Sequence, residues 1–285
     1  LFTQVLYGRA LYTSSVLIGV WWISVIALLI ISYSSLYIMS RRAEMSRASG
    51  WAGLIALIVI LKIGIIYSTN MTLMIRPDLW QEIYRTKPTG LTFGTGDPTV
   101  MPRWLFMMLG SIGVCGIALL FLAMKQNLAD GVAPFLRRWA GRLIAAFTVV
   151  QIILGIWVYR AQPAAVQDAL GGETFYRACA VLWLATAVAL IVLGGILSAK
   201  GAATWKFSTV LALVSFVNVV AMVLVRDGIR FVALGLAGFD IWDRAVSTNW
   251  STVILFLVLF VAGLGAMGWL ISVVARAKPV DERYA

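Results

Sequence analysis

The chain has 285 residues, of which 61% are hydrophobic and 12% are charged, and its mean hydropathy is +0.93. A water-soluble domain cannot expose that much apolar surface, so the composition indicates an integral membrane protein. The formal net charge is +11 and there is no histidine. In a membrane protein this basic excess reflects topology and contact with anionic lipid, so nucleic acid is not expected as a partner.

Apolar blocks long enough to cross a bilayer, which takes about 20 residues, recur along the chain. Because backbone groups inside the bilayer must be satisfied within the segment, blocks that are apolar on every face are expected to be helices and not barrel strands. The expected fold is all-α, a single polytopic transmembrane helical bundle over residues 1–285. The seven predicted spans are residues 15–38, 51–68, 104–124, 142–159, 178–198, 207–225 and 251–275.

Charged residues in the predicted loops set the expected orientation. The first loop holds Arg41, Arg42 and Arg47, whereas the second, fourth and sixth loops mix basic with acidic residues. Basic excess on alternate loops follows the positive-inside rule for an odd number of spans. We therefore expect the N-terminus outside, the C-terminus in the cytoplasm, and a location in the bacterial inner membrane.

Few polar side chains fall within the predicted spans. Lys62 is a functional hypothesis because a basic residue in a span is costly. It lies near the outer end, so snorkelling to the headgroups or a structural contact competes with a role in binding a ligand or quinone. Gln151 and Asn218 are more often interhelical hydrogen-bond partners. The predicted spans contain no Asp or Glu, which disfavours a carboxylate-based proton pump or cation-coupled transporter.

Two segments around the second loop resemble a known family. Residues 70–77, NMTLMIRP, leave the second span, and residues 97–109, DPTVMPRWLFMML, enter the third. Over roughly residues 70–120, the chain resembles the haem-bearing subunit of cytochrome bd-type quinol oxidases. In that family a helix exits through an Asn-containing segment with Met and Pro. The next helix enters through Asn-Pro-Thr and then Pro-Arg-aromatic-X-His-Met-Leu.

The histidine of that motif is an axial ligand of a b-type haem in the family, and the matching residue here is Phe106. The resemblance therefore implies a similar scaffold without its haem site. The sequence lacks the family's long quinol-binding loop, its other haem histidines and its membrane carboxylates. The resemblance therefore does not imply that this chain reduces oxygen. Pro, Arg and Trp at a helix start are also typical of any span entering from the outer face, which leaves an anchoring role open.

Candidate donors for a quinone headgroup gather at the predicted outer ends of the second to fourth spans. A quinone site needs an apolar slot with one or two hydrogen-bond donors. The candidates are Asn70, Arg76, Arg103, Trp104, Tyr159 and Arg160, with Lys62 deeper in the second span. Each is equally explained as an interfacial anchor, which is the commoner role for Trp104 and Tyr159.

The leading hypothesis is a haem-free subunit of a respiratory or photosynthetic electron-transfer complex. It would anchor redox subunits, cytochromes or iron–sulfur proteins, on the outer side and contribute to a quinone site. The chain has no histidine, and the spacing of Cys115 and Cys179 does not suggest an iron–sulfur site. Haem or iron–sulfur centres are therefore expected on those partners, and no catalytic residue or metal site is expected here. The alternatives are a small-solute transporter or channel with a polar path around Lys62, Gln151 and Asn218, and a scaffold or assembly factor without a ligand.

Overall fold

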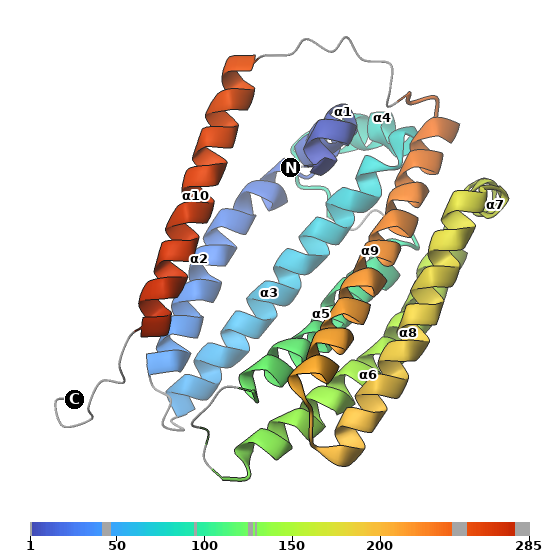
Figure 1. The fold of residues 1–285 in the computed structure, drawn as a ribbon. Coiled ribbons are helices and arrows are strands. Elements are labelled where there is room, and N and C mark those ends of the chain that lie inside the picture. Colours follow the sequence, from blue (N-terminus) through green and yellow to red (C-terminus); the bar gives the residue numbers. More distant parts are fainter. Residues whose placement is uncertain are drawn as a thin grey trace. The chain divides into compact units, whose positions relative to one another are not determined.

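The computed structural model describes residues 2–41, 47–93, 96–124, 128, 130–240 and 250–276. These residues form helices joined by turns and short loops, without a strand among them (Figure 1). Seven of the helices are long and apolar enough to cross a membrane. The predicted all-α polytopic bundle is therefore confirmed, whereas the predicted orientation of the termini stays a prediction. The chain divides into two compact units, Leu1–Ile241 and Trp242–Ala285.

Each predicted span corresponds to one long helix. The long helices are α2 (Gly19–Arg41), α3 (Arg47–Met74), α5 (Val100–Leu122), α6 (Val132–Arg160), α8 (Thr174–Lys200), α9 (Trp205–Leu236) and, in the second unit, α10 (Trp250–Arg276). Three shorter helices are α1 (Phe2–Leu17), α4 (Pro77–Thr86) and α7 (Ala164–Gly172). The first predicted span began too early, because residues 15–17 belong to α1 and the chain turns at Ile18 before α2.

The helix α9 differs most from its predicted span, which ended at residue 225. Its 32 residues continue to Leu236. Charged side chains at Arg226, Asp227 and Arg230 lower the hydropathy after that point, but they do not stop a helix, because arginine is a good helix former. At 1.5 Å per residue, α9 is about 48 Å long, which exceeds the roughly 30 Å hydrocarbon core. Because its charged residues lie in the last turns, these turns are expected at the depth of the headgroups.

The first unit is built around four packed helices. α5 packs against α6, α6 against α8 and α8 against α9, while α9 also contacts α5. The pair α2 and α3 joins this group through contacts between α3 and α5 (Figure 1). Leu120, Ile144, Leu190, Leu197 and Leu211 form the apolar core of the four-helix group. Most other apolar side chains on the long helices are exposed, as expected of surfaces that face lipid.

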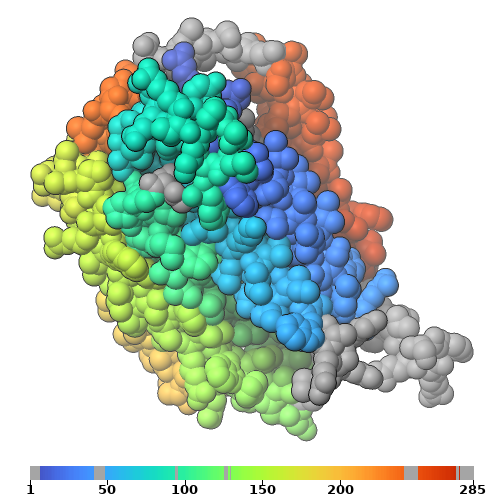
Figure 2. Space-filling model, turned by 180° about the vertical axis from the view of Figure 1, so that it is seen from behind, coloured from blue at the N-terminus to red at the C-terminus, as the bar shows by residue number. Residues whose placement is uncertain are grey.

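The three short helices lie at one end of this unit, which we call the capped end (Figure 1). α1 contacts α3 and α4, and Figure 2 shows α4, in teal, beside α1, in blue. α7 contacts α8 and α9. A second apolar cluster includes Tyr7, Met74, Val166, Leu170 and Ile229, contributed by α1, α3, α7 and α9. Burial of these side chains fixes the short helices to the ends of the long ones.

Close backbone contact joins α6 to α8 at two glycines. A Cβ atom on Gly141 would lie 2.5 Å from both the Gly194 carbonyl oxygen and the Ser198 nitrogen. Only residues without a side chain allow this approach, which is the usual way in which membrane helices gain van der Waals contact. The pair therefore sets the distance between α6 and α8.

Replacing Gly141 by alanine is expected to destabilise the protein by about 1–3 kcal/mol, because the added methyl group overlaps the backbone of α8. Gly195→Ala is the matched control, since nothing lies within 4 Å of its added Cβ. The control is expected to be neutral or slightly stabilising, because alanine favours the helix. Thermal unfolding in one detergent, followed by tryptophan fluorescence, measures the difference. Equal melting temperatures for the two variants would contradict the close contact.

Candidate functional site

Polar side chains are concentrated at the capped end, where α3 ends and α5 begins. The buried polar or charged residues there include Ser68, Thr69, Asn70, Thr72, Asp97, Thr99, Gln162 and Arg230. Crossing a membrane does not require such residues, and burying them is costly unless they are hydrogen-bonded. The network that they form is therefore the candidate functional site.

An ion pair fixes the connection between α3, α4 and α5. Arg76, in the turn between α3 and α4, pairs with Asp97 and also with Asp78 at 2.8 Å. The Asp97 carboxylate accepts hydrogen bonds from the Thr99 backbone nitrogen at 2.8 Å and from its hydroxyl at 2.6 Å, just before α5 begins. The side chain of Asp97 is 1% exposed and that of Asp78 is 56% exposed. The hydrogen bonds from Arg76 lower the pKa of Asp78, and Asp78 in turn raises the pKa of Arg76.

Arg103, in the first turn of α5, connects α3 to the end of α6. Its Nη1 lies 3.5 Å from both the Met71 carbonyl oxygen and the Thr72 hydroxyl, and its Nη2 donates to Gln162 Oε1 at 3.2 Å. Gln167 of α7 continues the network, because its Nε2 donates to the Gln162 carbonyl at 2.8 Å. The Tyr159 hydroxyl donates to the Gln167 carbonyl at 3.1 Å. Four helices are thus connected through side-chain hydrogen bonds.

The end of α9 brings a further charged group to the same place. The Tyr7 hydroxyl of α1 donates to Asp227 Oδ1 at 2.8 Å. Arg230 Nη1 lies 3.9 Å from the same carboxylate oxygen, and its Nη2 lies 3.6 Å from the Met71 sulfur. Arg230 is only 9% exposed. Burial, and then the hydrogen bond to Asp227, raise the pKa of Tyr7.

The structure places the predicted donors in two groups. Asn70, Arg76, Arg103, Tyr159 and Arg160 lie at the capped end. Asn70 Nδ2 donates to Ser15 Oγ at 3.1 Å, and its Oδ1 is buried without a partner among the described residues. Arg160 is exposed and enters the network through its backbone carbonyl, which accepts a hydrogen bond from Gln167 Nε2 at 3.3 Å.

The other two predicted donors lie deeper along the helices. Trp104 Nε1 donates to the Leu61 carbonyl at 3.1 Å, which ties α5 to α3. Lys62 is exposed, and its Nζ lies 5.1 Å from the ring centroid of Trp21. A cation over an aromatic ring at a lipid-facing surface is typical of snorkelling. Neither side chain joins the network at the capped end.

Tyr7, Gln162, Gln167, Asp227 and Arg230 belong to the network, but sequence reasoning did not select them. The available signal was the spacing of Arg226, Asp227 and Arg230 just beyond an apolar block, which places both arginines on one helix face. A span drawn to end at residue 225 left these residues in a loop.

Phe106 lies in the four-helix group, against aromatic and amide side chains. Its ring centroid is 6.4 Å from that of Trp183 on α8, with the planes inclined by 50°. Gln151 Nε2 of α6 donates to the Phe106 carbonyl at 2.7 Å. Asn218 Nδ2 of α9 donates to the Trp183 carbonyl and to the Thr186 hydroxyl, both at 2.9 Å. Gln151 and Asn218 therefore join neighbouring helices, as their positions within the spans predicted.

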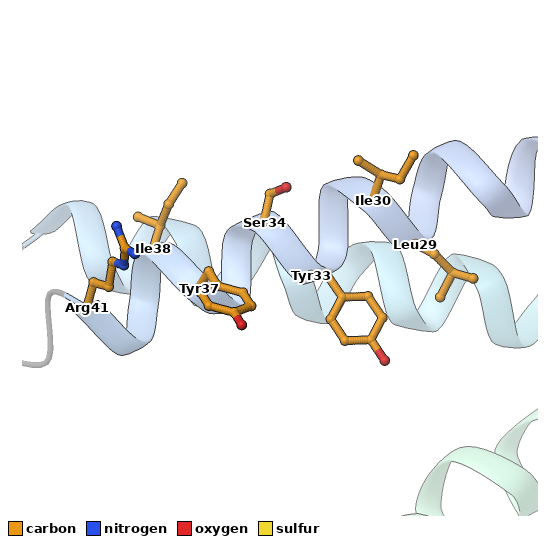
Figure 3. Close-up of a pocket in the computed structure, with 7 residues that line it drawn as sticks. All are labelled: Leu29, Ile30, Tyr33, Ser34, Tyr37, Ile38 and Arg41. Carbon is orange, nitrogen blue, oxygen red and sulfur yellow. The ribbon is translucent and has the colours of Figure 1, made fainter. Parts of the chain in front are cut away.

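A shallow hollow lies on the surface of α2, away from this network. It is lined by Leu29, Ile30, Tyr33, Ser34, Tyr37, Ile38 and Arg41 (Figure 3). All of these residues come from one exposed helix face, so the hollow is an open surface feature. In the part of the chain that the structure describes, no three His, Cys, Asp or Glu side chains come together as metal ligands.

The sequence matches no family model and no curated protein, and the structure matches no solved structure.

The two carboxylates that contact Arg76 offer a matched pair of variants. Asp97→Asn is expected to destabilise the protein by about 2–3 kcal/mol, because Arg76 loses its buried counter-charge and keeps only the more exposed Asp78. Asp78→Asn is expected to cost less than about 1 kcal/mol, because that carboxylate is more than half exposed. Thermal unfolding of both variants beside the unmodified protein measures the difference, and equal losses would show that burial of Asp97 does not matter.

The pair formed by Tyr7 and Asp227 predicts a loss of stability at alkaline pH. The folded protein holds the Tyr7 proton more tightly than the unfolded chain, because the pKa of Tyr7 is raised in the fold. Above the ordinary tyrosine pKa of about 10, stability should therefore fall by up to about 1.4 kcal/mol per pH unit. Tyr7→Phe removes this component, so the difference in stability between the two proteins should shrink from pH 9 to pH 11. A constant difference in unfolding free energy over that range contradicts the prediction.

Proposed function

We propose that this chain is a haem-free integral subunit of a respiratory or photosynthetic electron-transfer complex in the bacterial inner membrane. It anchors redox subunits at the capped end, which the charge pattern predicts to be the outer face, and contributes there to a quinone site. The observation that carries this proposal is the packing at Phe106, the position at which the similar family has a haem ligand.

Side chains from α6 and α8 contact Phe106 of α5. The Phe106 ring meets Trp183, and the Gln151 amide binds the Phe106 carbonyl. Gly155 of α6 makes room for Trp183, because a Cβ atom there would lie 2.5 Å from Trp183 Cη2. This packing supports a chain in which α3 and α5 form a helix pair similar to that of the family but without its haem, so that the redox centres belong to partner subunits.

The exposed donor of the proposed quinone contact is Arg160. The donor groups of Asn70, Arg76, Trp104 and Tyr159 are already engaged within the chain, so these residues shape the capped end. Arg160 ends α6 with its side chain exposed. Ile156 and Trp157, one turn earlier, are 53% and 47% exposed. An apolar surface beside a cationic donor at headgroup depth suits a quinone ring and its tail.

The contacts of the polar residues within the spans favour this proposal over the transporter alternative. A solute path requires Lys62, Gln151 and Asn218 to face a common space. Instead, Lys62 lies over Trp21 of α2, Gln151 bonds to α5 and Asn218 bonds to α8. Each side chain contacts a separate neighbour, which supports a structural role for all three.

The decisive experiment is purification in mild detergent, with partner identification by mass spectrometry and reduced-minus-oxidised spectra of the complex and of the isolated chain. Cytochromes or iron–sulfur proteins should copurify, and the isolated chain should show no haem bands. A chain that purifies alone and colourless would overturn the proposal. Haem bound to the isolated chain would overturn the interpretation of Phe106.

Quinone titration of the same complex tests the contribution of Arg160. Arg160→Gln should weaken quinone binding by about tenfold, because one charge-assisted hydrogen bond is lost. Arg177→Gln is the control, since Arg177 is an exposed arginine near the start of α8. Equal affinities for the two variants would remove the quinone contact from the proposal and leave the anchoring role.

A further inference from the structure

Two arginines from different helices converge on one residue of α3. Arg103 Nη1 of α5 lies 3.5 Å from the Met71 carbonyl oxygen, and Arg230 Nη2 of α9 lies 3.6 Å from the Met71 sulfur. We propose that these two guanidinium groups, together with the exposed Arg226 of α9, bind the phosphate of an anionic phospholipid at the capped end, between α3, α5 and α9. The proposal goes beyond the function proposed above, because it requires neither a redox partner nor a quinone.

Arginines outnumber the carboxylates among the described residues that meet at this place, which are Arg76, Arg103, Arg226 and Arg230 beside Asp78, Asp97 and Asp227. The acceptors that Arg103 reaches, on Met71, Thr72 and Gln162, are all neutral. Arg230 has Asp227 at 3.9 Å, and that carboxylate oxygen already accepts the Tyr7 hydroxyl proton. Asp97 is engaged by Arg76 and Thr99. Burying a guanidinium group is costly unless a close anion compensates for it, so the arrangement calls for a further negative charge.

The start of α5 and the end of α9 are expected at the depth where lipid phosphates are found. α9 is longer than the hydrocarbon core requires, so Arg230 falls beyond the part that spans it, and Arg103 lies in the first turn of α5. Arg226 is exposed one turn before Arg230, on the same face of α9. Leu224 and Phe231 on this helix are 36% and 41% exposed and offer apolar contact for acyl chains. The exposed Arg226 and the buried Arg230 therefore lie along one face of α9, from the surface inward.

The chemistry favours a phosphate over a quinone at this position. A phosphodiester is anionic over the whole physiological pH range, whereas a quinone and its protonated quinol are neutral. The planar fork of a guanidinium group presents paired N–H donors that match two phosphate oxygens. Anionic phospholipids surround every inner-membrane protein, and basic pockets between transmembrane helices are known to bind their headgroups.

The test uses the full chain in detergent. Native mass spectrometry detects retained phospholipid, and the melting temperature is followed during titration with phosphatidylglycerol, phosphatidylcholine or inorganic phosphate. The unmodified protein should retain an anionic phospholipid and be stabilised by phosphatidylglycerol above all. Arg230→Gln and Arg226→Gln should weaken that binding by about tenfold or more. Arg177→Gln should leave it within about twofold of the unmodified protein.

Several outcomes would overturn the proposal. One is equal affinity for phosphatidylglycerol in the unmodified protein and in both variants. Another is equal stabilisation by phosphatidylcholine, which would show that the anionic headgroup is not recognised. Equal stabilisation by inorganic phosphate would assign the site to a free anion, and displacement of the lipid by quinol would assign it to the quinone. Because Arg226 is exposed, its variant decides the question even if Arg230→Gln fails to fold.

Discussion

The capped end depends on one buried carboxylate. Asp97 pairs with Arg76 at the end of α3 and accepts two hydrogen bonds from Thr99, where α5 is about to begin. The position of Arg103, four residues after Thr99, follows from this junction, and so does its reach to Met71 and Gln162. A single acidic group thus sets the register between α3 and α5 at the end where α1, α4 and α7 pack. Because the Asp97 side chain is 1% exposed, water cannot replace either of its partners without opening the junction.

The spans were predictable from the sequence because the bilayer imposes a strong and simple constraint. About 20 apolar residues must form a helix whose backbone is satisfied internally, so block length and composition are sufficient to locate it. The same reasoning fails where a helix leaves the hydrocarbon core. The last turns of α9 carry Arg226 and Asp227, and α4 begins with Pro77 and Asp78, so neither segment is apolar enough to stand out. Their helical form depends on packing at the capped end, which a hydropathy pattern does not record.

The candidate site was predictable in part for the same reason. Asn70, Arg76, Arg103 and Tyr159 lie at predicted span ends, so their common depth followed from the topology. The hydrogen-bond partners in the network could not be predicted in this way. Tyr7 and Asp227, for example, are 220 residues apart, and no local sequence pattern connects them. Depth alone also did not separate Trp104, which bonds to Leu61 within the helix pair, from the donors of the network. The sequence indicates the depth in the membrane at which a side chain lies, whereas its contacts at that depth depend on how the helices pack.

Polar side chains of the first unit gather at two places, beside Phe106 and at the capped end. The two places differ in how completely their polar groups are hydrogen-bonded or paired with an opposite charge. Beside Phe106, the amides of Gln151 and Asn218 are neutral and donate short hydrogen bonds to neighbouring helices. At the capped end, Arg103 and Arg230 are charged, and their contacts range from 3.2 to 3.9 Å. A neutral and satisfied amide contributes to packing, whereas a buried charge with only long or neutral contacts retains affinity for an anion. Ligand chemistry in this chain is therefore expected at its arginine-rich end, and the middle of the bundle serves as the rigid support that holds the arginines in place.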